Sequence, residues 1–326
     1  MVATAFTLAA QGISAKPAHP PPDAAQRAEA LNAATAGANL VIGARGSAVV
    51  RAQVLMDRAW FSPGEIDGRF SANMQRALKG YQQAAGLAVN GKIDRAVWQA
   101  LAAGDAQPFA TYTVTDADVA GPYAPIPAAM MERAKLKSLG YTSMAEALGE
   151  RFHMSPKLLR ELNPGPLRAG REIVVAHIGG GSGDALVVPK GASIRIDKSE
   201  RMLYALDSAG KAVAGFPISI GGPLDPLPLG RMKITTEVTN PTFTYDPALL
   251  KNAQRGSVKT EIAPGPNNPV GNVWLGLSKP HWGIHGTPSP ERLGREETNG
   301  CIHMTNWDAR RLSTIAKAGF VVDVRE

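Results

Sequence analysis

The sequence has a single cysteine, Cys301, among its 326 residues. A disulfide bond within the chain is therefore impossible, and the fold must be stable without one. No apolar run reaches the ~18–20 residues that a membrane-spanning helix needs, so we expect no transmembrane segment. Aromatic residues make up only 6% of the chain, and its net charge of +7 is spread without a basic block. This composition argues against a nucleic-acid-binding protein.

The proportions of apolar residues (44%) and charged residues (19%) are those of a folded chain, and its length predicts two or three domains. Residues 1–22 stand apart, because an apolar stretch of small residues runs into a proline-rich segment. The pattern resembles a secretory signal, except that no Lys or Arg precedes the apolar stretch. A start upstream of Met1 would explain this, and an Ala-rich disordered tail is the alternative. We expect an export signal.

Residues 47–102 predict a compact unit of three short helices. Val50 and Val54 lie on one helical face, Ser71 is placed to cap the second helix, and Asx-Gly turns separate the helices. The unit resembles the peptidoglycan-binding domain type 1 of cell-wall enzymes. The resemblance is carried by Gln53, Ile66-Asp67-Gly68, Ala77 to Gln82, Gly86-Leu87, Asn90 to Asp94 and Trp98. An unrelated three-helix bundle is the alternative.

Residues 111–177 predict an α+β segment with a proline-rich insertion. A first strand is expected at Tyr112–Thr115 and a last one at Ile173–Val175, and Ser155 is placed to cap a helix between them. The stretch from Ala145 to Val175 resembles the second half of a LysM glycan-binding module. We therefore describe this segment as LysM-like.

Residues 178–185 are rich in glycine and predict a flexible linker. Beyond it, apolar and polar residues alternate, which predicts a mainly β domain over residues 190–326. One helix is expected there, from about Trp307 to Ala318. The expected strands are Ile194–Asp197, Met202–Leu206, Phe216–Ile220, Lys233–Val238, Val273–Leu275 and Phe320–Val324.

Residues suited to acyl transfer precede the predicted helix. Cys301 comes shortly before the capping pair Thr305 and Asn306, where a helix dipole would favour its thiolate. His285 lies at the end of an apolar strand and supplies an imidazole, and a Cys–His pair is sufficient for nucleophilic acyl transfer. One alternative is a buried structural thiol. Another is a zinc site of unusual spacing, with ligands His281, His285, Cys301 and His303.

Residues 265–309 closely resemble the L,D-transpeptidase catalytic domain, also called the YkuD domain. The likeness runs from about Ala192 to Val324. It is carried by His285-Gly286-Thr287, Asn299-Gly300-Cys301, Leu227 to Gly230, Asn240-Pro241 and Tyr245 to Pro247. The resemblance implies a β-sandwich-like catalytic domain. The expected fold class is therefore multidomain: a helical peptidoglycan-binding domain, a LysM-like α+β segment and a mainly β catalytic domain.

By the same resemblance, Cys301 is the nucleophile and His285 is the general base and acid. The backbone carbonyl of Gly286 orients the imidazole, and the N–H of Gly300 contributes to the oxyanion hole. The expected substrate-binding residues are His281, Asn299 and His303. The last two depart from the family pattern, which has His and Arg at these positions, so His303 would hold a substrate carboxylate only while protonated. No metal and no cofactor are implied.

The implied activity is that of a peptidoglycan L,D-transpeptidase, an acyltransferase that forms a thioester with its cysteine. Such an enzyme makes 3→3 cross-links between stem peptides or attaches proteins to them. An L,D-carboxypeptidase and a non-catalytic wall-binding protein are the alternatives. The expected partners are stem peptides and glycan, and the expected form is an exported monomer, in the periplasm or cell wall, that acts in wall biogenesis and cell shape. The part beyond about Gly183 is expected to act alone on soluble fragments.

Overall fold

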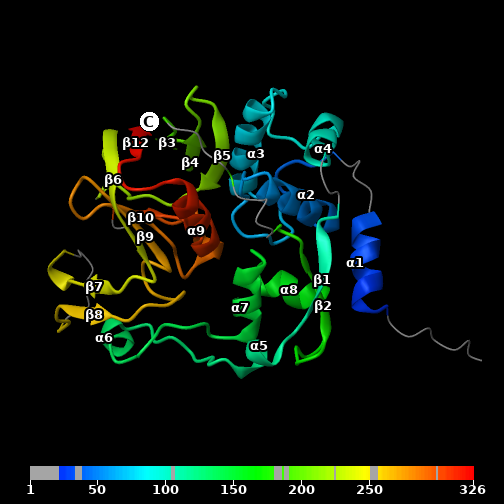
Figure 1. Cartoon of the computed structure of the whole chain (residues 1–326), viewed down its shortest axis with the longest axis horizontal. Helices are drawn as coiled ribbons and strands as arrows, with labels where there is room; N and C mark the ends of the chain where they lie inside the picture. The colour runs from blue at the N-terminus through cyan, green and yellow to red at the C-terminus, as the bar shows by residue number, and fades with distance from the viewer. Residues whose placement is uncertain are drawn as a thin grey trace, which may run out of the picture.

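The structure is a computed structural model that describes residues 22–33, 39–103, 107–179, 186, 191–223, 225–249, 256–298 and 300–326. It consists of a helical N-terminal part, a middle part and a sheet-containing C-terminal part, which pack side by side (Figure 1). Most of the expected export signal and of the linker, together with Asn299, lies outside the described residues. Within the described residues, no helix has the length and apolar character needed to cross a membrane.

Helix caps and buried side-chain amides fix the turns of the N-terminal part. Its helices are α1 (Ala24–Ala33), α2 (Ser47–Arg58), α3 (Ala72–Ala84) and α4 (Arg95–Leu101). The predicted cap of α3 is confirmed, since the Ser71 hydroxyl accepts a hydrogen bond from the Met74 N–H at 3.2 Å. The buried Gln53 side chain accepts from the Gly68 N–H at 2.8 Å and donates to the Asp67 carboxylate at 3.0 Å. This amide fixes the turn between α2 and α3.

The middle part is a pair of antiparallel strands with short helices between them. Its elements are β1 (Phe109–Thr113), α5 (Asp116–Ala120), α6 (Met130–Arg133), α7 (Met144–Arg151), α8 (Pro156–Leu162) and β2 (Glu172–Ala176). The strand expected at Tyr112–Thr115 instead spans Phe109–Thr113, because Thr115 caps α5. It pairs with the expected second strand, with Tyr112 opposite Ile173. The predicted cap of α8 is also confirmed, because the Ser155 hydroxyl accepts from the Leu158 N–H at 3.0 Å and Pro156 opens the helix.

The C-terminal part is built on an eight-stranded sheet with the order β11-β10-β9-β6-β12-β3-β4-β5. Its strands are β3 (Ser193–Asp197), β4 (Met202–Leu206), β5 (Ala212–Pro217), β6 (Gly230–Thr239), β9 (Val273–Leu277), β10 (Gly283–His285), β11 (Ile302–His303) and β12 (Val321–Arg325). β12 lies in the middle of the sheet, parallel to β3 and antiparallel to β6. The remaining elements are β7 (Phe243–Tyr245), β8 (Thr260–Ile262), the 3₁₀ helices η1 (Pro247–Leu249) and η2 (Pro290–Arg292), and α9 (Asn306–Ile315).

This sheet curls until its two edges meet. Ser219, just beyond β5, exchanges backbone hydrogen bonds with His303 of β11, at N···O distances of 3.1 and 2.9 Å. The curl encloses an apolar core, and α9 packs against β9 and β10. The strand expected at Phe216–Ile220 therefore ends early, at Pro217, because the residues after it cross to the opposite edge. The expected sandwich-like domain is one curled sheet.

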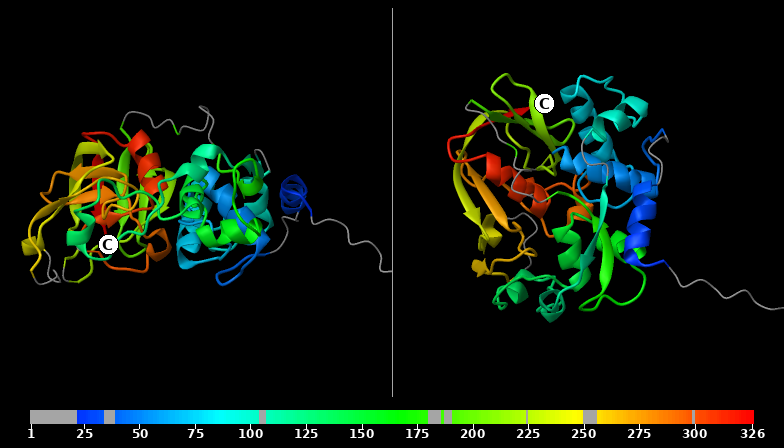
Figure 2. Two further views of the ribbon diagram at one scale, coloured as in Figure 1. Left: turned by 90° about the horizontal axis from the view of Figure 1, so that it is seen from below. Right: turned by 45° about the vertical axis from the view of Figure 1, so that its right-hand side comes forward.

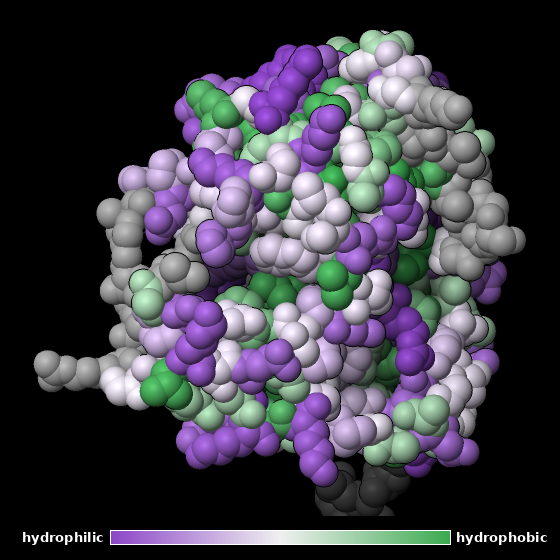
Figure 3. Space-filling model, turned by 60° about the vertical axis from the view of Figure 1, so that its left-hand side comes forward, coloured by the Kyte–Doolittle hydropathy of each residue, from purple (hydrophilic) through white to green (hydrophobic). Residues whose placement is uncertain are grey.

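Apolar clusters join the three parts of the molecule pairwise. One cluster combines α2 and α3 with Met202, Tyr204 and Leu206 of β4. A second combines α2 with the helices and strands of the middle part, and a third joins Leu139 to Ile262 of β8. Seen from below, the N-terminal helices and α7 and α8 lie against one side of the C-terminal part, whereas α6 lies beside β8 (Figures 1 and 2). On the face in Figure 3, hydrophobic residues are dispersed among hydrophilic ones.

A buried polar cluster lies where the three parts meet. The carboxylate of Asp57 in α2 is 2.9 Å from the guanidinium of Arg311 in α9 and 3.1 Å from Nδ1 of His153 in the middle part. Burial raises the pKa of Asp57, but the charges of Arg311 and His153 hold it below its usual value. The Ser62 hydroxyl donates to the carboxylate of Asp308 at 2.8 Å. Both carboxylates are fully buried, so the parts are joined by specific polar contacts as well as apolar surface.

Candidate active site

The parallel pairing of β10 and β11 places the predicted nucleophile and base on neighbouring strand segments. His285 is opposite His303, and Ile284 is opposite Ile302. Cys301 directly precedes β11, and side chains alternate between the faces of a strand, so Cys301 and His303 share the face of His285. The two isoleucines are fully buried on the other face. The short segment between Gly283 and Gly286, which carries His285, is therefore positioned by its buried isoleucine.

His285 is a buried imidazole held on two sides. It is 2% exposed, its Nδ1 donates to the backbone carbonyl of Gly286 at 2.7 Å, and its ring stacks on Trp274 with centroids 5.4 Å apart. Nε2 is consequently the atom that can accept a proton. Burial lowers the pKa of His285 to about 4, although the bond to Gly286 opposes this shift. The imidazole is therefore neutral at neutral pH.

Cys301 is half-buried, and its thiol donates to the carbonyl of His281 across 3.6 Å. Burial raises the pKa of the Cys301 thiol above its ordinary value, and the backbone N–H of Gly283 only partly offsets this. The expected effect of a helix dipole is wrong, because α9 begins at Asn306 and β11 lies between that helix and the cysteine. The resting pair is a neutral thiol with a neutral imidazole.

His303 is placed beside the candidate base, with its ring centroid 4.4 Å from that of His285. Its buried Nδ1 has no hydrogen-bond partner among the described residues. Burial and the neighbouring His285 lower the pKa of His303 well below its usual value. His303 was expected to titrate near neutrality, but its lowered pKa keeps it uncharged there. The structure therefore favours a packing role for His303 over a charged contact with substrate.

The other expected site residues differ in exposure: Gly300 is buried, whereas His281 is exposed. Gly300 has φ +111°, and a Cβ at this position would lie 3.5 Å from the ring of Trp282. His281 is exposed and has φ +66°, so its backbone rather than its side chain contacts Cys301. The structure does not describe Asn299. In the described part of the chain, no three His, Cys, Asp or Glu side chains gather as metal ligands would, which leaves the zinc alternative without support there.

Sequence analysis did not identify three residues that support the site. Trp274 stacks on His285 from β9, and only the register of β9 against β10 reveals it. The Asn306 side chain lies against Gly286. The carboxylate of Glu150, from the middle part, accepts a hydrogen bond from the Asn306 amide. Asn306 was expected only as part of a helix cap. No spacing in the sequence links Glu150 to a site 150 residues downstream in the chain.

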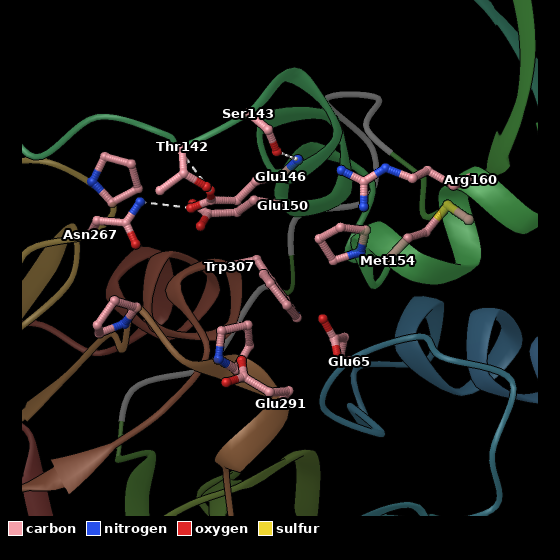
Figure 4. A pocket seen from close by; sticks show the side chains of 14 residues that line it. Glu65, Thr142, Ser143, Glu146, Glu150, Met154, Arg160, Asn267, Glu291 and Trp307 are labelled. Carbon is pink, nitrogen blue, oxygen red and sulfur yellow. Dashed lines mark hydrogen bonds between the residues drawn. The ribbon is translucent and has the colours of Figure 1, made fainter. Parts of the chain in front are cut away.

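A cavity of about 340 Å³ lies where the three parts meet (Figure 4). Carboxylates line it from each side: Glu65 from the N-terminal part, Glu146 and Glu150 from α7, and Glu291 from η2. Burial and the nearby charges of Asp67 and Glu291 raise the pKa of Glu65 to about 8. The residues predicted to form the active site do not line this cavity.

Two family models match the chain. The L,D-transpeptidase catalytic domain (YkuD) matches residues 191–324, and a putative peptidoglycan binding domain matches residues 45–101. A putative L,D-transpeptidase YkuD of Bacillus licheniformis is 28% identical over 183 residues, which are 55% of this chain and 92% of the relative. Its Bacillus subtilis counterpart is 29% identical over 176 residues, 53% of this chain and 88% of the relative.

Solved structures of the same class show weaker overall similarity. An L,D-transpeptidase from Xylanimonas cellulosilytica is 16% identical and aligns over 89% of this chain and 99% of its own, with a TM-score of 0.38. One from Mycobacterium smegmatis is 16% identical over 42% of this chain, with a TM-score of 0.34. The alignment spans 59% of that mycobacterial chain.

The fold and the Cys–His site thus define a cysteine acyltransferase. The C-terminal part matches the L,D-transpeptidase catalytic domain, a family whose mechanism uses a cysteine nucleophile, and a match to a putative peptidoglycan binding domain precedes it in the chain.

Proposed function

We propose that this enzyme acylates itself at Cys301 with a peptidoglycan stem peptide and transfers the acyl group to an amine of a second stem peptide. The observation that carries the proposal is the pairing of β10 with β11, which puts Cys301 and the Nδ1-anchored His285 on one face. A thiol and an imidazole that are both neutral at rest fit a mechanism in which the proton moves during attack.

In the proposed acylation step, Nε2 of His285 takes the thiol proton as Sγ of Cys301 attacks the carbonyl of the third stem residue. The Sγ–C bond forms, and the negative charge on the carbonyl oxygen is stabilised by the N–H groups of Gly300 and Cys301. The C–N bond to the terminal D-alanine then breaks, and His285 returns the proton to the leaving amine. Gly286 keeps the imidazole oriented throughout.

Deacylation decides which product forms. If an amine of a neighbouring stem peptide attacks the thioester, a 3→3 cross-link or a protein attachment results. If water attacks, the enzyme is an L,D-carboxypeptidase. His281, Asn299 and His303 are proposed to shape the substrate pocket, with His303 acting as a neutral packing residue.

The test is to incubate the protein with disaccharide-tetrapeptide and to follow cross-linked dimer and free D-alanine by mass spectrometry. Cys301→Ala and His285→Ala should each remove both products, because a nucleophile and its base act as a unit. A dimer formed by either variant at more than a tenth of the wild-type rate contradicts the assignment. A carbapenem adduct on wild-type Cys301 would eliminate the non-catalytic alternative, and its absence would favour it.

We further propose that residues 47–102 bind the wall and that the middle part is a LysM-like module for glycan. The support is the family match at residues 45–101 and the two paired strands that enclose α5 to α8. Such an enzyme would be exported and act in the periplasm or cell wall as a monomer. Retention on insoluble sacculi, compared with an Arg95→Glu variant that reverses the exposed charge of α4, tests the binding.

A further inference from the structure

Glu150 belongs to the middle part, but its carboxylate contacts mainly side chains of the catalytic part. It lies at the end of α7, its side chain is 10% exposed, and it points toward the C-terminal part (Figure 4). One of its oxygens accepts from the side-chain amide of Asn306 at 2.9 Å. The other is within reach of the Asn272 amide at 3.3 Å, the Tyr141 hydroxyl at 3.1 Å and the Arg310 guanidinium at 3.4 Å. Three of these four donors belong to the catalytic part.

The contact with Glu150 determines how the Asn306 amide is oriented. Its Nδ2 donates to Glu150 and, at 3.0 Å, to the carbonyl of Pro266, while its Oδ1 accepts from the Asn272 N–H at 3.3 Å. Two acceptors on one side and a donor on the other leave only one satisfactory orientation. Without Glu150, the amide keeps the Pro266 carbonyl and the Asn272 N–H as partners but loses its carboxylate acceptor, so its position is held less firmly.

The oriented amide supports the turn that anchors the catalytic imidazole. Oδ1 of Asn306 lies so close to Gly286 that a Cβ there would be 2.1 Å away from it. The carbonyl of this same Gly286 accepts the bond from Nδ1 of His285. Contacts therefore run without a gap from Glu150 through Asn306 and Gly286 to His285.

We propose that Glu150 is a positioning residue for the acyl-transfer reaction: by fixing the amide of Asn306 it holds the Gly286 carbonyl that keeps His285 in its Nδ1–H tautomer. This inference rests on the proposed role of His285 as the base. It gives the middle part a function in catalysis that is separate from any binding of glycan. An imidazole in the other tautomer presents an N–H to the thiol and cannot accept its proton.

The test compares Glu150→Gln with Tyr141→Phe, which removes a donor to Glu150 but leaves the Asn306 contact in place. With disaccharide-tetrapeptide, Glu150→Gln should lower kcat about tenfold or more with KM changed less than about twofold, as expected for a misplaced catalytic group. Tyr141→Phe should stay within about twofold of the wild-type kcat. A second variant, Asn306→Ala, breaks the same contact chain without adding a polar group, and Thr305 still caps α9.

A spectroscopic measurement separates positioning from general loosening. The buried, hydrogen-bonded Nδ1–H of His285 should give a downfield proton resonance, identified by its absence in His285→Gln. It should persist in Tyr141→Phe and weaken in Glu150→Gln and Asn306→Ala. The inference is wrong if Glu150→Gln and Asn306→Ala both keep the wild-type kcat and an unchanged resonance. It is also wrong if these two variants and Tyr141→Phe lose the resonance equally. If His285→Gln itself keeps the wild-type kcat, the proposed function fails instead.

Discussion

At the scale of single residues, the two proposed catalytic side chains, Cys301 and His285, are both neutral at rest. His285 must be unprotonated to accept the thiol proton, and with a pKa of about 4 it is unprotonated throughout the neutral range. We therefore expect kcat/KM for tetrapeptide to stay flat as the pH falls from 7.5 to about 5.5 and to decline only as it approaches 4. A decline centred near 6.5, the ordinary value of histidine, would mean that the imidazole is open to water.

The thiol provides an independent check on the same pair. Because burial raises the pKa of Cys301, the rate of alkylation by iodoacetamide should keep rising above pH 8.5 in the wild-type protein. His285→Ala should leave that rise in place, since the neutral imidazole does not stabilise the thiolate at rest. A plateau in alkylation rate below pH 7 would instead indicate a thiolate–imidazolium pair.

His303 is the residue at which the structure changes the expectation most. The sequence suggests that His303→Arg restores a charge for a substrate carboxylate and lowers KM. The ring is partly buried, with its centroid 4.4 Å from that of His285, so the longer side chain of arginine would crowd the site and place a charge beside the proposed base. We expect His303→Arg to lower the Tm and reduce kcat, at a cost of about 1–3 kcal/mol in unfolding free energy. A lower KM with an unchanged Tm would restore the charged-contact hypothesis, and His303→Asn serves as the smaller control.

At the scale of elements, α3 packs against β4 through a position that only glycine fits. Alanine is favoured over glycine within a helix by about 1 kcal/mol. A Cβ on Gly80, however, would lie 2.6 Å from the ring of Tyr204, which is buried and also packed against Gly215. We expect Gly80→Ala to destabilise the protein by about 1–3 kcal/mol in urea unfolding. Gly140→Ala, with no neighbour closer than 3.9 Å, is the matched control and should cost little.

Helix caps and short strands were predictable because their signals are local. Ser71 and Ser155 cap the helices expected of them, and β3 and β4 lie within a residue of their predicted bounds. The candidate Cys–His pair was also predictable, from residue types and a family motif. The curled closure of the sheet was not, because the bridge from Ser219 to His303 joins residues far apart in the sequence. The protonation states depend on burial and could not be read from the sequence.

At the scale of the whole molecule, the three parts form one packed unit, which argues against a catalytic part that acts alone. Removing the first 190 residues would expose Met202, Tyr204 and Leu206 and leave Asp308 without its Ser62 partner. We expect a protein cut at a protease site placed in residues 181–185 to elute as one species on gel filtration and to stay active. Two separate peaks with an active C-terminal half would establish that the modules are independent.

The position of β12 has a consequence for how the chain is made. This strand follows every other strand of its sheet in the sequence, yet it lies in the middle, between β6 and β3. Before this strand is synthesised, β6 and β3 have no common partner, and the two halves of the sheet meet only where Ser219 contacts His303. Val321–Arg325 must emerge before the core can close. The helical part can fold during translation, whereas the catalytic part becomes competent only after its synthesis is nearly finished.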